Sequence, residues 1–158
     1  MRLLRVLVAL MLAAVSVVGL EVGLAAAASA APLVKQNFTL TSDNPEEPGG
    51  TVVASGAINA VGEDVVVSDT EDMFVFPDGT LTIVHAAVRS KDHFNEHTCA
   101  AWFKEAGTYV ISEGTDQYEG VSGSGTYRVA GRFQSDCVSE PTGSFTITAK
   151  GSINLPTP

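Results

Sequence analysis

The sequence is short of cationic residues. It holds 9 Lys and Arg against 18 Asp and Glu in 158 residues, a formal net charge of −9. So acidic a chain repels phosphate backbones and anionic lipid headgroups, which argues against nucleic acid and membrane surfaces as partners. Charged residues make up 17% and hydrophobic ones 45%, a balance that argues against wholesale disorder.

Several catalytic and cofactor signatures are missing as well. No Gly-Lys-Ser/Thr sequence of a phosphate-binding loop occurs, and the cysteines form no C-x-x-C motif. The stretch Gly120-Val121-Ser122-Gly123-Ser124 does not fit the G-x-S-x-G nucleophile elbow, because Ser124 stands where the second Gly belongs. We therefore expect no cofactor and no serine nucleophile.

The first 30 residues have the pattern of a secretory signal peptide. Arg2 and Arg5 precede an apolar run at 7–20, and Ala28-Ser29-Ala30 offers the small residues that signal peptidase requires. Glu21 and the shortness of the run argue against the alternative, an uncleaved membrane anchor. We expect cleavage after Ala30 and export of residues 31–158 as one domain. Loss of Arg2, Arg5 and Glu21 leaves 7 Lys and Arg against 17 Asp and Glu, a net charge of −10.

Only two cysteines occur, Cys99 and Cys137. In an exported protein an even pair predicts one disulfide. The loop it would close spans about 39 residues, for which chain entropy gives about 4 kcal/mol of stabilisation. Two free thiols or a catalytic cysteine are the alternative.

Short β-type runs separated by Gly and Pro turns dominate the exported part. The turn Pro77-Asp78-Gly79 predicts a hairpin, and residues 90–97 read as an irregular polar segment. A helix over 92–105 competes with a strand there, but the β-branched stretch beyond Gly107 favours the strand. Eight strands are expected, near 33–41, 51–60, 65–67, 73–76, 81–88, 98–113, 126–130 and 143–153. Even spacing and short loops predict an all-β fold, a closed antiparallel barrel of about eight strands, with a β-sandwich as the alternative.

The segment 107–127 carries a family resemblance. Gly107-Thr108-Tyr109, then Gly114-Thr115-Asp116-Gln117-Tyr118 and Gly123-Ser124-Gly125-Thr126-Tyr127 resemble the allene oxide cyclase-like and dirigent-like barrel proteins over residues 80–135. The chain is also similar to small secreted actinobacterial proteins in which a Thr-Cys pair precedes the long strand and a second Cys follows the G-x-G-T strand. The resemblance implies an eight-stranded barrel whose lumen holds an apolar ligand. It carries over no catalytic residue.

Three aromatic residues are the candidate ligand-binding site: Trp102, Tyr109 and Tyr127. Each combines apolar area with one polar group, which suits an amphipathic ligand. Trp102 and Tyr109 stand an odd number of residues apart, so both face the lumen only if a bulge near Gly107 intervenes. Core packing is the competing interpretation of these rings.

Titratable residues give weaker signals. His93-Phe94-Asn95-Glu96-His97 matches H-x-x-E-H, but that zinc motif needs a helix, and we expect none here and no metal site. Asp64, Asp69, Glu71 and Asp72 form either a solvated rim or a weak Ca²⁺ site. Glu105 and Glu113 share a strand face unless a bulge intervenes, and a glutamate facing the lumen would be an acid–base candidate.

Two functions follow from these expectations. The first is a secreted, non-enzymatic barrel that binds a small apolar ligand or an extracellular partner. The alternative is an isomerase or cyclase acting on an apolar substrate in the lumen. A lumen of a few hundred Å³ is needed for a ligand to be enclosed.

Overall fold

The computed structural model describes residues 32–43, 49–138 and 142–156. The expected signal peptide lies outside these residues. The described chain is nearly all strand, and its one helix is a single 3₁₀ turn, η1 (Asp116–Tyr118). No helix of the described ranges is long and apolar enough to cross a membrane. The strands are β1 (Val34–Ser42), β2 (Gly50–Gly56), β3 (Ala60–Ser68), β4 (Glu71–Phe76), β5 (Gly79–Asn95), β6 (Ala100–Gly114), β7 (Ser122–Gln134) and β8 (Thr142–Asn154).

These strands close into an eight-stranded antiparallel barrel, which confirms the predicted fold class. Each strand pairs with its neighbour in sequence, and β8 pairs with β1, from Val34 opposite Ile153 to Ser42 opposite Phe145. Closure leaves the barrel no free sheet edge. Strand alternation sends one set of side chains inward, among them Phe38, Leu81 and Ile153, each at most 1% exposed.

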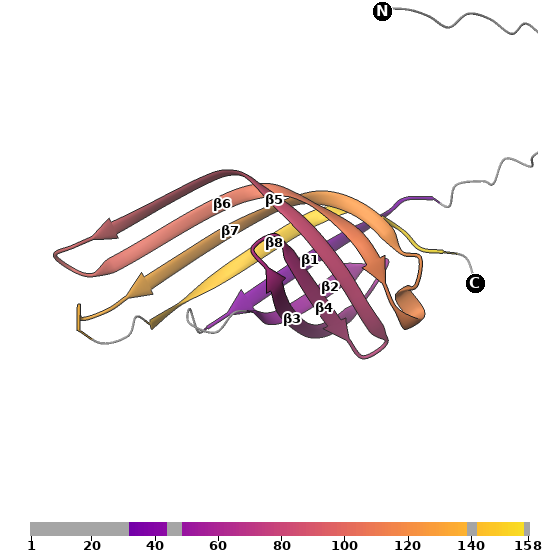
Figure 1. Cartoon of the computed structure of the whole chain (residues 1–158), viewed down its shortest axis with the longest axis horizontal. Coiled ribbons are helices and arrows are strands. Elements are labelled where there is room, and N and C mark those ends of the chain that lie inside the picture. Colours follow the sequence, from indigo (N-terminus) through magenta and orange to yellow (C-terminus); the bar gives the residue numbers. More distant parts are fainter. Residues whose placement is uncertain (1–31, 44–48, 139–141, 157–158) are drawn as a thin grey trace, which may run out of the picture.

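Four strands continue past the barrel. β5 to β8 have 17, 15, 13 and 13 residues, whereas β1 to β4 have 6 to 9. Beyond the residues that pair with β4, they run on together as an antiparallel sheet (Figure 1). We call this sheet the extension; it consists of residues 89–95, 100–106, 128–134 and 142–148, of which 145–148 also pair with β1 in the barrel.

The expectation that 90–97 is irregular is wrong for its larger part, because β5 continues to Asn95. The alternation of apolar and polar residues that marks a barrel strand is absent there, since this part of β5 lies outside the barrel and is exposed throughout. Strand, not helix, also occupies Ala100–Gly114.

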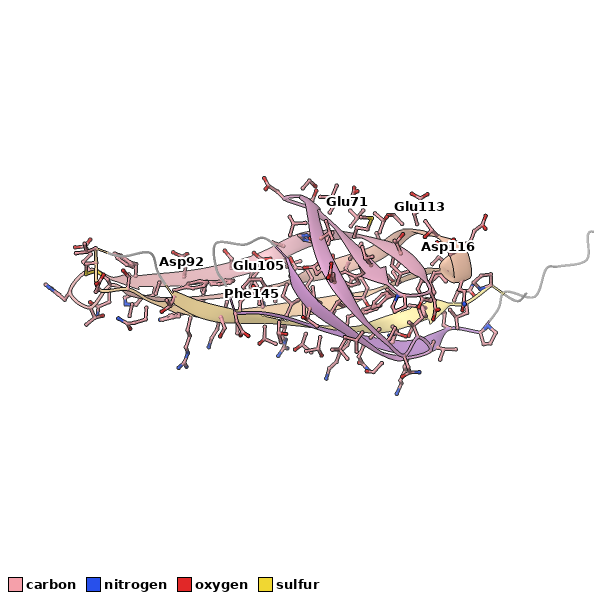
Figure 2. The ribbon with its side chains drawn as sticks, turned by 90° about the horizontal axis from the view of Figure 1, so that it is seen from below. Glu71, Asp92, Glu105, Glu113, Asp116 and Phe145 are labelled. Atoms are coloured by element: carbon pink, nitrogen blue, oxygen red, sulfur yellow. A yellow bond between two sulfur atoms is a disulfide. The ribbon has the colours of Figure 1, made fainter. Side chains whose placement is uncertain are left out.

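The predicted disulfide Cys99–Cys137 is present, with a Cα–Cα distance of 5.3 Å. Cys99 immediately precedes β6, and Cys137 follows the end of β7. The bond therefore fastens the far tip of the extension rather than the barrel (Figure 2).

Candidate functional site

A cavity of about 90 Å³ lies inside the barrel at the end that adjoins the extension, which we call the mouth. Ligand pockets measure roughly 300–1,000 Å³, so this lumen cannot enclose a drug-sized molecule. It has room for about three waters at roughly 30 Å³ each. Its apolar walls are Phe38, Leu40, Phe74, Ile83, Tyr109, Val129, Ile147 and Ala149, and Asp72, His85, Glu105 and Tyr127 complete them.

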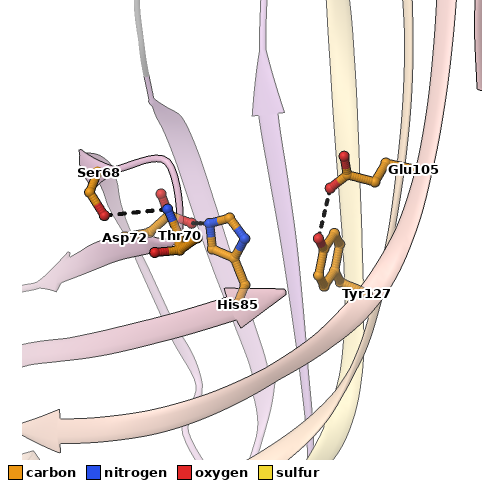
Figure 3. Close-up of polar contacts among 6 residues, drawn as sticks. All are labelled: Ser68, Thr70, Asp72, His85, Glu105 and Tyr127. Carbon is orange, nitrogen blue, oxygen red and sulfur yellow. Dashed lines mark hydrogen bonds and ion pairs between the residues drawn. The ribbon is translucent and has the colours of Figure 1, made fainter. Parts of the chain in front are cut away.

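The four polar residues of the mouth form two pairs (Figure 3). His85 Nε2 lies 3.3 Å from Asp72 Oδ2. The Tyr127 hydroxyl donates a hydrogen bond to Glu105 Oε1 over 2.7 Å. The rings of His85 and Tyr127 meet edge to face with centroids 5.7 Å apart, so the two pairs are in contact.

Burial shifts the protonation equilibria of the mouth. It raises the pKa of Asp72, and the neighbouring His85 opposes part of that rise. Burial also raises the pKa of Tyr127, and the Glu105 carboxylate that accepts its hydrogen bond raises it further. Tyr127 therefore keeps its proton and remains a donor, while Asp72 takes up a proton more readily than an exposed aspartate.

A further carboxylate, Asp64 on β3, points into the barrel and is 7% exposed. Burial, and secondarily the charge of Asp72, raise its pKa to about 7. Its Oδ1 atom has no hydrogen-bond partner among the described residues. The interpretation of Asp64 and Asp72 as part of a solvated rim is therefore wrong, because their strand positions turn both inward.

Aromatic side chains continue from the mouth along the inner face of the extension. The rings of Phe103 and Phe133 stack with centroids 5.5 Å apart and planes 8° from parallel, and Phe145 lies 6.5 Å from Phe103. All three are half-buried. We call them the phenylalanine shelf. Phe103 packs over Gly131 directly opposite, where a Cβ atom would fall 2.2 Å from the ring.

The structure separates the three predicted site residues. Tyr109 and Tyr127 line the lumen cavity. Trp102 faces outward, because β6 and β7 pair without interruption from Ala100 to Ile111 and the odd spacing to Tyr109 places it on the opposite face. The bulge expected near Gly107 lies instead in the partner strand, at Val88. Trp102 is therefore no part of the lumen wall.

Sequence reasoning missed the shelf and the His85–Asp72 pair. Residues an even number of positions apart on a strand face the same side of the sheet. Phe133 lies six residues from Tyr127 on β7 and so faces the same side, a signal that could have revealed the shelf. Glu105 faces the lumen, as considered from the sequence. Glu113 does not share its face, because the extra residue Ser112 shifts the register.

The H-x-x-E-H match has no helical context. His93 lies on β5, and His97 lies in the turn between β5 and β6. Within residues 32–43, 49–138 and 142–156, no group of three or more His, Cys, Asp or Glu side chains is arranged to hold a metal ion.

Searches against protein-family models, curated proteins and solved structures find no match to this chain. The resemblance to allene oxide cyclase-like and dirigent-like barrels stays a prediction from the sequence. Arguments about function therefore rest on the geometry of the mouth and of the extension.

Proposed function

We propose that this is a secreted binding protein that holds an amphipathic, largely apolar ligand on the inner face of the extension. The ligand's polar group lies at the mouth, against the Tyr127–Glu105 and His85–Asp72 pairs. Its apolar part lies over the phenylalanine shelf. The observation that carries this proposal is that three half-buried phenylalanines lead directly into the polar mouth.

The volume of the lumen and the length of the extension both favour a ligand on the extension over a ligand enclosed in the lumen. The lumen cavity is only about 90 Å³, below the volume of ordinary ligand pockets. Along β7 the distance from Tyr127 to Phe133 is about 20 Å, at roughly 3.3 Å per residue. That length suits an extended long-chain fatty acid. Accessible aromatic surface beside polar groups is typical of ligand sites.

Titration with a fluorescent long-chain fatty acid tests the proposal. Phe133→Ser removes one ring of the shelf outside the barrel core, so we expect a folded protein with about tenfold weaker binding, the loss of one buried ring's contribution. Val110→Ser, an outward-facing and 47% exposed position on β6, is the matched control and should leave the affinity unchanged. Equal affinities for both variants and the parent chain would refute the shelf as the site.

The mouth favours a second candidate, an acid–base isomerase. An imidazole paired with a buried carboxylate can accept and return a proton beside a bound apolar substrate. The compound to try is an unsaturated lipid epoxide, which is what the plant allene oxide cyclases that the sequence resembles rearrange. Product of unchanged mass but altered structure, lost in His85→Gln while fatty-acid binding persists, would support catalysis. Absence of any turnover would leave binding as the function.

A further inference from the structure

The charges of the chain are sorted onto opposite sides of the molecule. All seven Lys and Arg of the described residues face outward on five consecutive barrel strands, as their register partners show. They are Lys35 on β1, Arg89 and Lys91 on β5, Lys104 on β6, Arg128 and Arg132 on β7, and Lys150 on β8. We call this the basic face.

Carboxylates avoid this face. Strands β1, β7 and β8 contain no Asp or Glu. In the extension, Asp92 and Glu105 each follow a lysine in sequence, and strand alternation turns them to the inner face. Figure 2 shows the separation: nitrogen-tipped side chains project below the yellow β8, whereas Glu71, Glu113 and Asp116 lie on the upper side.

Among the described residues, no ion pair neutralises the basic face. Lys91 stands directly opposite Lys104 in the antiparallel register, an arrangement that destabilises a sheet. Among the described residues the one ion pair is His85–Asp72, on the inner side. A protein with a net charge of −9 thus gathers its cations on one face, and none of them forms an ion pair with another described residue.

Two adjoining depressions touch this face. The larger measures about 1,000 Å³ and is lined by the outward-facing Trp102, Lys104 and Arg132. It is also lined by Phe103, Phe133 and Phe145 of the phenylalanine shelf, so it borders both faces of the extension. The smaller measures about 510 Å³ and is lined by Arg89, Lys91 and Arg128. Glu105, whose side chain turns to the lumen, also borders it. Small and hydroxyl-bearing residues lie among the cations. Ala130 and Thr146 line both depressions, Ser144 lines the larger and Thr148 the smaller.

One aromatic ring lies among these cations. Lys104 Nζ is 5.7 Å from the centre of the Trp102 ring, and the His93 ring is 6.1 Å away on the neighbouring strand. Trp102 is 38% exposed. The face of a tryptophan ring packs against the apolar face of a pyranose ring. Side-chain hydroxyl groups beside it form hydrogen bonds with the sugar hydroxyls.

We propose that the basic face binds an anionic polysaccharide, a linear glycan carrying carboxylate or sulfate groups. Its anionic groups meet the lysines and arginines, and one sugar ring packs on Trp102. On β8, Ser144 pairs with Arg132 and Ser152 pairs with Lys35. These two positions are eight residues apart, about 27 Å along the strand, so a polymer can contact several cations at once. Single-stranded nucleic acid is favoured by rows of stacking aromatics, whereas this face has the single pair of Trp102 and His93.

The test is titration of the exported protein with heparin, a sulfated glycan containing uronic acids, followed by the fluorescence of Trp102, the one tryptophan of the sequence. We expect saturable binding that weakens with salt and no response to neutral dextran. The double variant Lys104→Gln/Arg132→Gln should bind about tenfold more weakly or worse. Val61→Glu/Val67→Glu changes the net charge by the same amount at exposed positions of β3 and should bind as the parent does.

Three results would overturn the proposal. The first is an equal loss in both double variants, which would make the effect one of overall charge. The second is equal affinity for single-stranded polynucleotides or for anionic lipid vesicles. The third is salt-sensitive self-association that disappears in Lys104→Gln/Arg132→Gln, which would assign the face to contacts between copies of the chain. His85→Gln, at the mouth and in the lining of neither depression, should bind heparin normally, which separates this site from the mouth.

Discussion

Tyr127 holds the carboxylate of Glu105 across the barrel mouth, donating a hydrogen bond of 2.7 Å from β7 to β6. The same ring packs against Gly107, its direct neighbour across the strands, where a Cβ atom would lie 2.6 Å from the ring. A tyrosine thus covers a glycine and satisfies an inward-facing charge at once. This pair lies at the boundary between the apolar lumen and the open extension.

Loss of the Tyr127 hydroxyl should destabilise the fold. Tyr127→Phe leaves the Glu105 carboxylate without its donor, and we expect the free energy of unfolding to fall by about 1–3 kcal/mol in urea denaturation. Glu105→Gln retains an amide oxygen that accepts the same hydrogen bond, so its effect should be smaller. A larger loss in Glu105→Gln than in Tyr127→Phe would contradict this assignment of donor and acceptor.

Asp64 should make stability depend on pH. Its pKa is about 7 in the folded chain against 3.8 ordinarily, so between about pH 4 and pH 7 the folded state binds more protons than the unfolded state. Its contribution to the free energy of unfolding is therefore largest below pH 4 and falls as the pH rises to 7. Asp64→Asn removes this fall and should gain, relative to the parent, up to about 4 kcal/mol between pH 4 and pH 8, less where solvent screens the carboxylate.

The matched control for Asp64 is Asp78→Asn, an exposed aspartate in the turn between β4 and β5. Urea denaturation at pH 4, 6 and 8 gives the comparison. The pH dependence of Asp78→Asn should follow that of the parent. If Asp64→Asn did so as well, Asp64 would be charged and solvated at neutral pH in the folded state.

The strand pattern and the cysteine pair were sufficient to predict the barrel and the disulfide, because period-2 alternation and an even cysteine count are local signals. The prediction that Trp102 faces the lumen is wrong for a non-local reason. A bulge can relieve the same register mismatch in either of two paired strands, and here it lies at Val88 of β5 rather than near Gly107 of β6.

Net charge does not describe how the charges are distributed over the surface. The argument against polyanions averages the charges over the whole surface, whereas the sheet sorts them. Lys104 and Glu105 are adjacent in sequence and lie on opposite faces. Which face becomes basic depends on the register of five strands, and composition does not contain that information.

The amino terminus should begin at Ala31 after export. The charged start, the apolar run and Ala28-Ser29-Ala30 motivate this expectation. Intact mass spectrometry of the protein from culture medium should show a chain lacking its first 30 residues. Recovery of the full-length chain from the membrane fraction would instead support an anchor.

Reduction of Cys99–Cys137 should lower stability, by up to about 4 kcal/mol if the loop of about 39 residues determines the effect. Both cysteines have left-handed backbones, with φ of 49° and 68°, which non-glycine residues adopt rarely. The bond fastens only the tip of the extension. We therefore expect hydrogen exchange to accelerate first at 100–104 and 130–134, while amides near Phe38 stay protected. Uniform acceleration throughout the barrel would contradict this order.

The lumen cavity can be tested by filling it. Ala149 is 7% exposed and forms part of the cavity wall, opposite Tyr127 and Phe38. Ala149→Val adds two methyl groups that the cavity of about 90 Å³ can accept, and valine suits a strand. Filling such a space should raise the free energy of unfolding by about 0.5–1 kcal/mol in thermal or urea denaturation. Ala130→Val on the outer face should change stability by less than about 0.5 kcal/mol. A loss of about 1–3 kcal/mol in Ala149→Val would mean that the space is already occupied in solution, because overpacking a filled core has that effect.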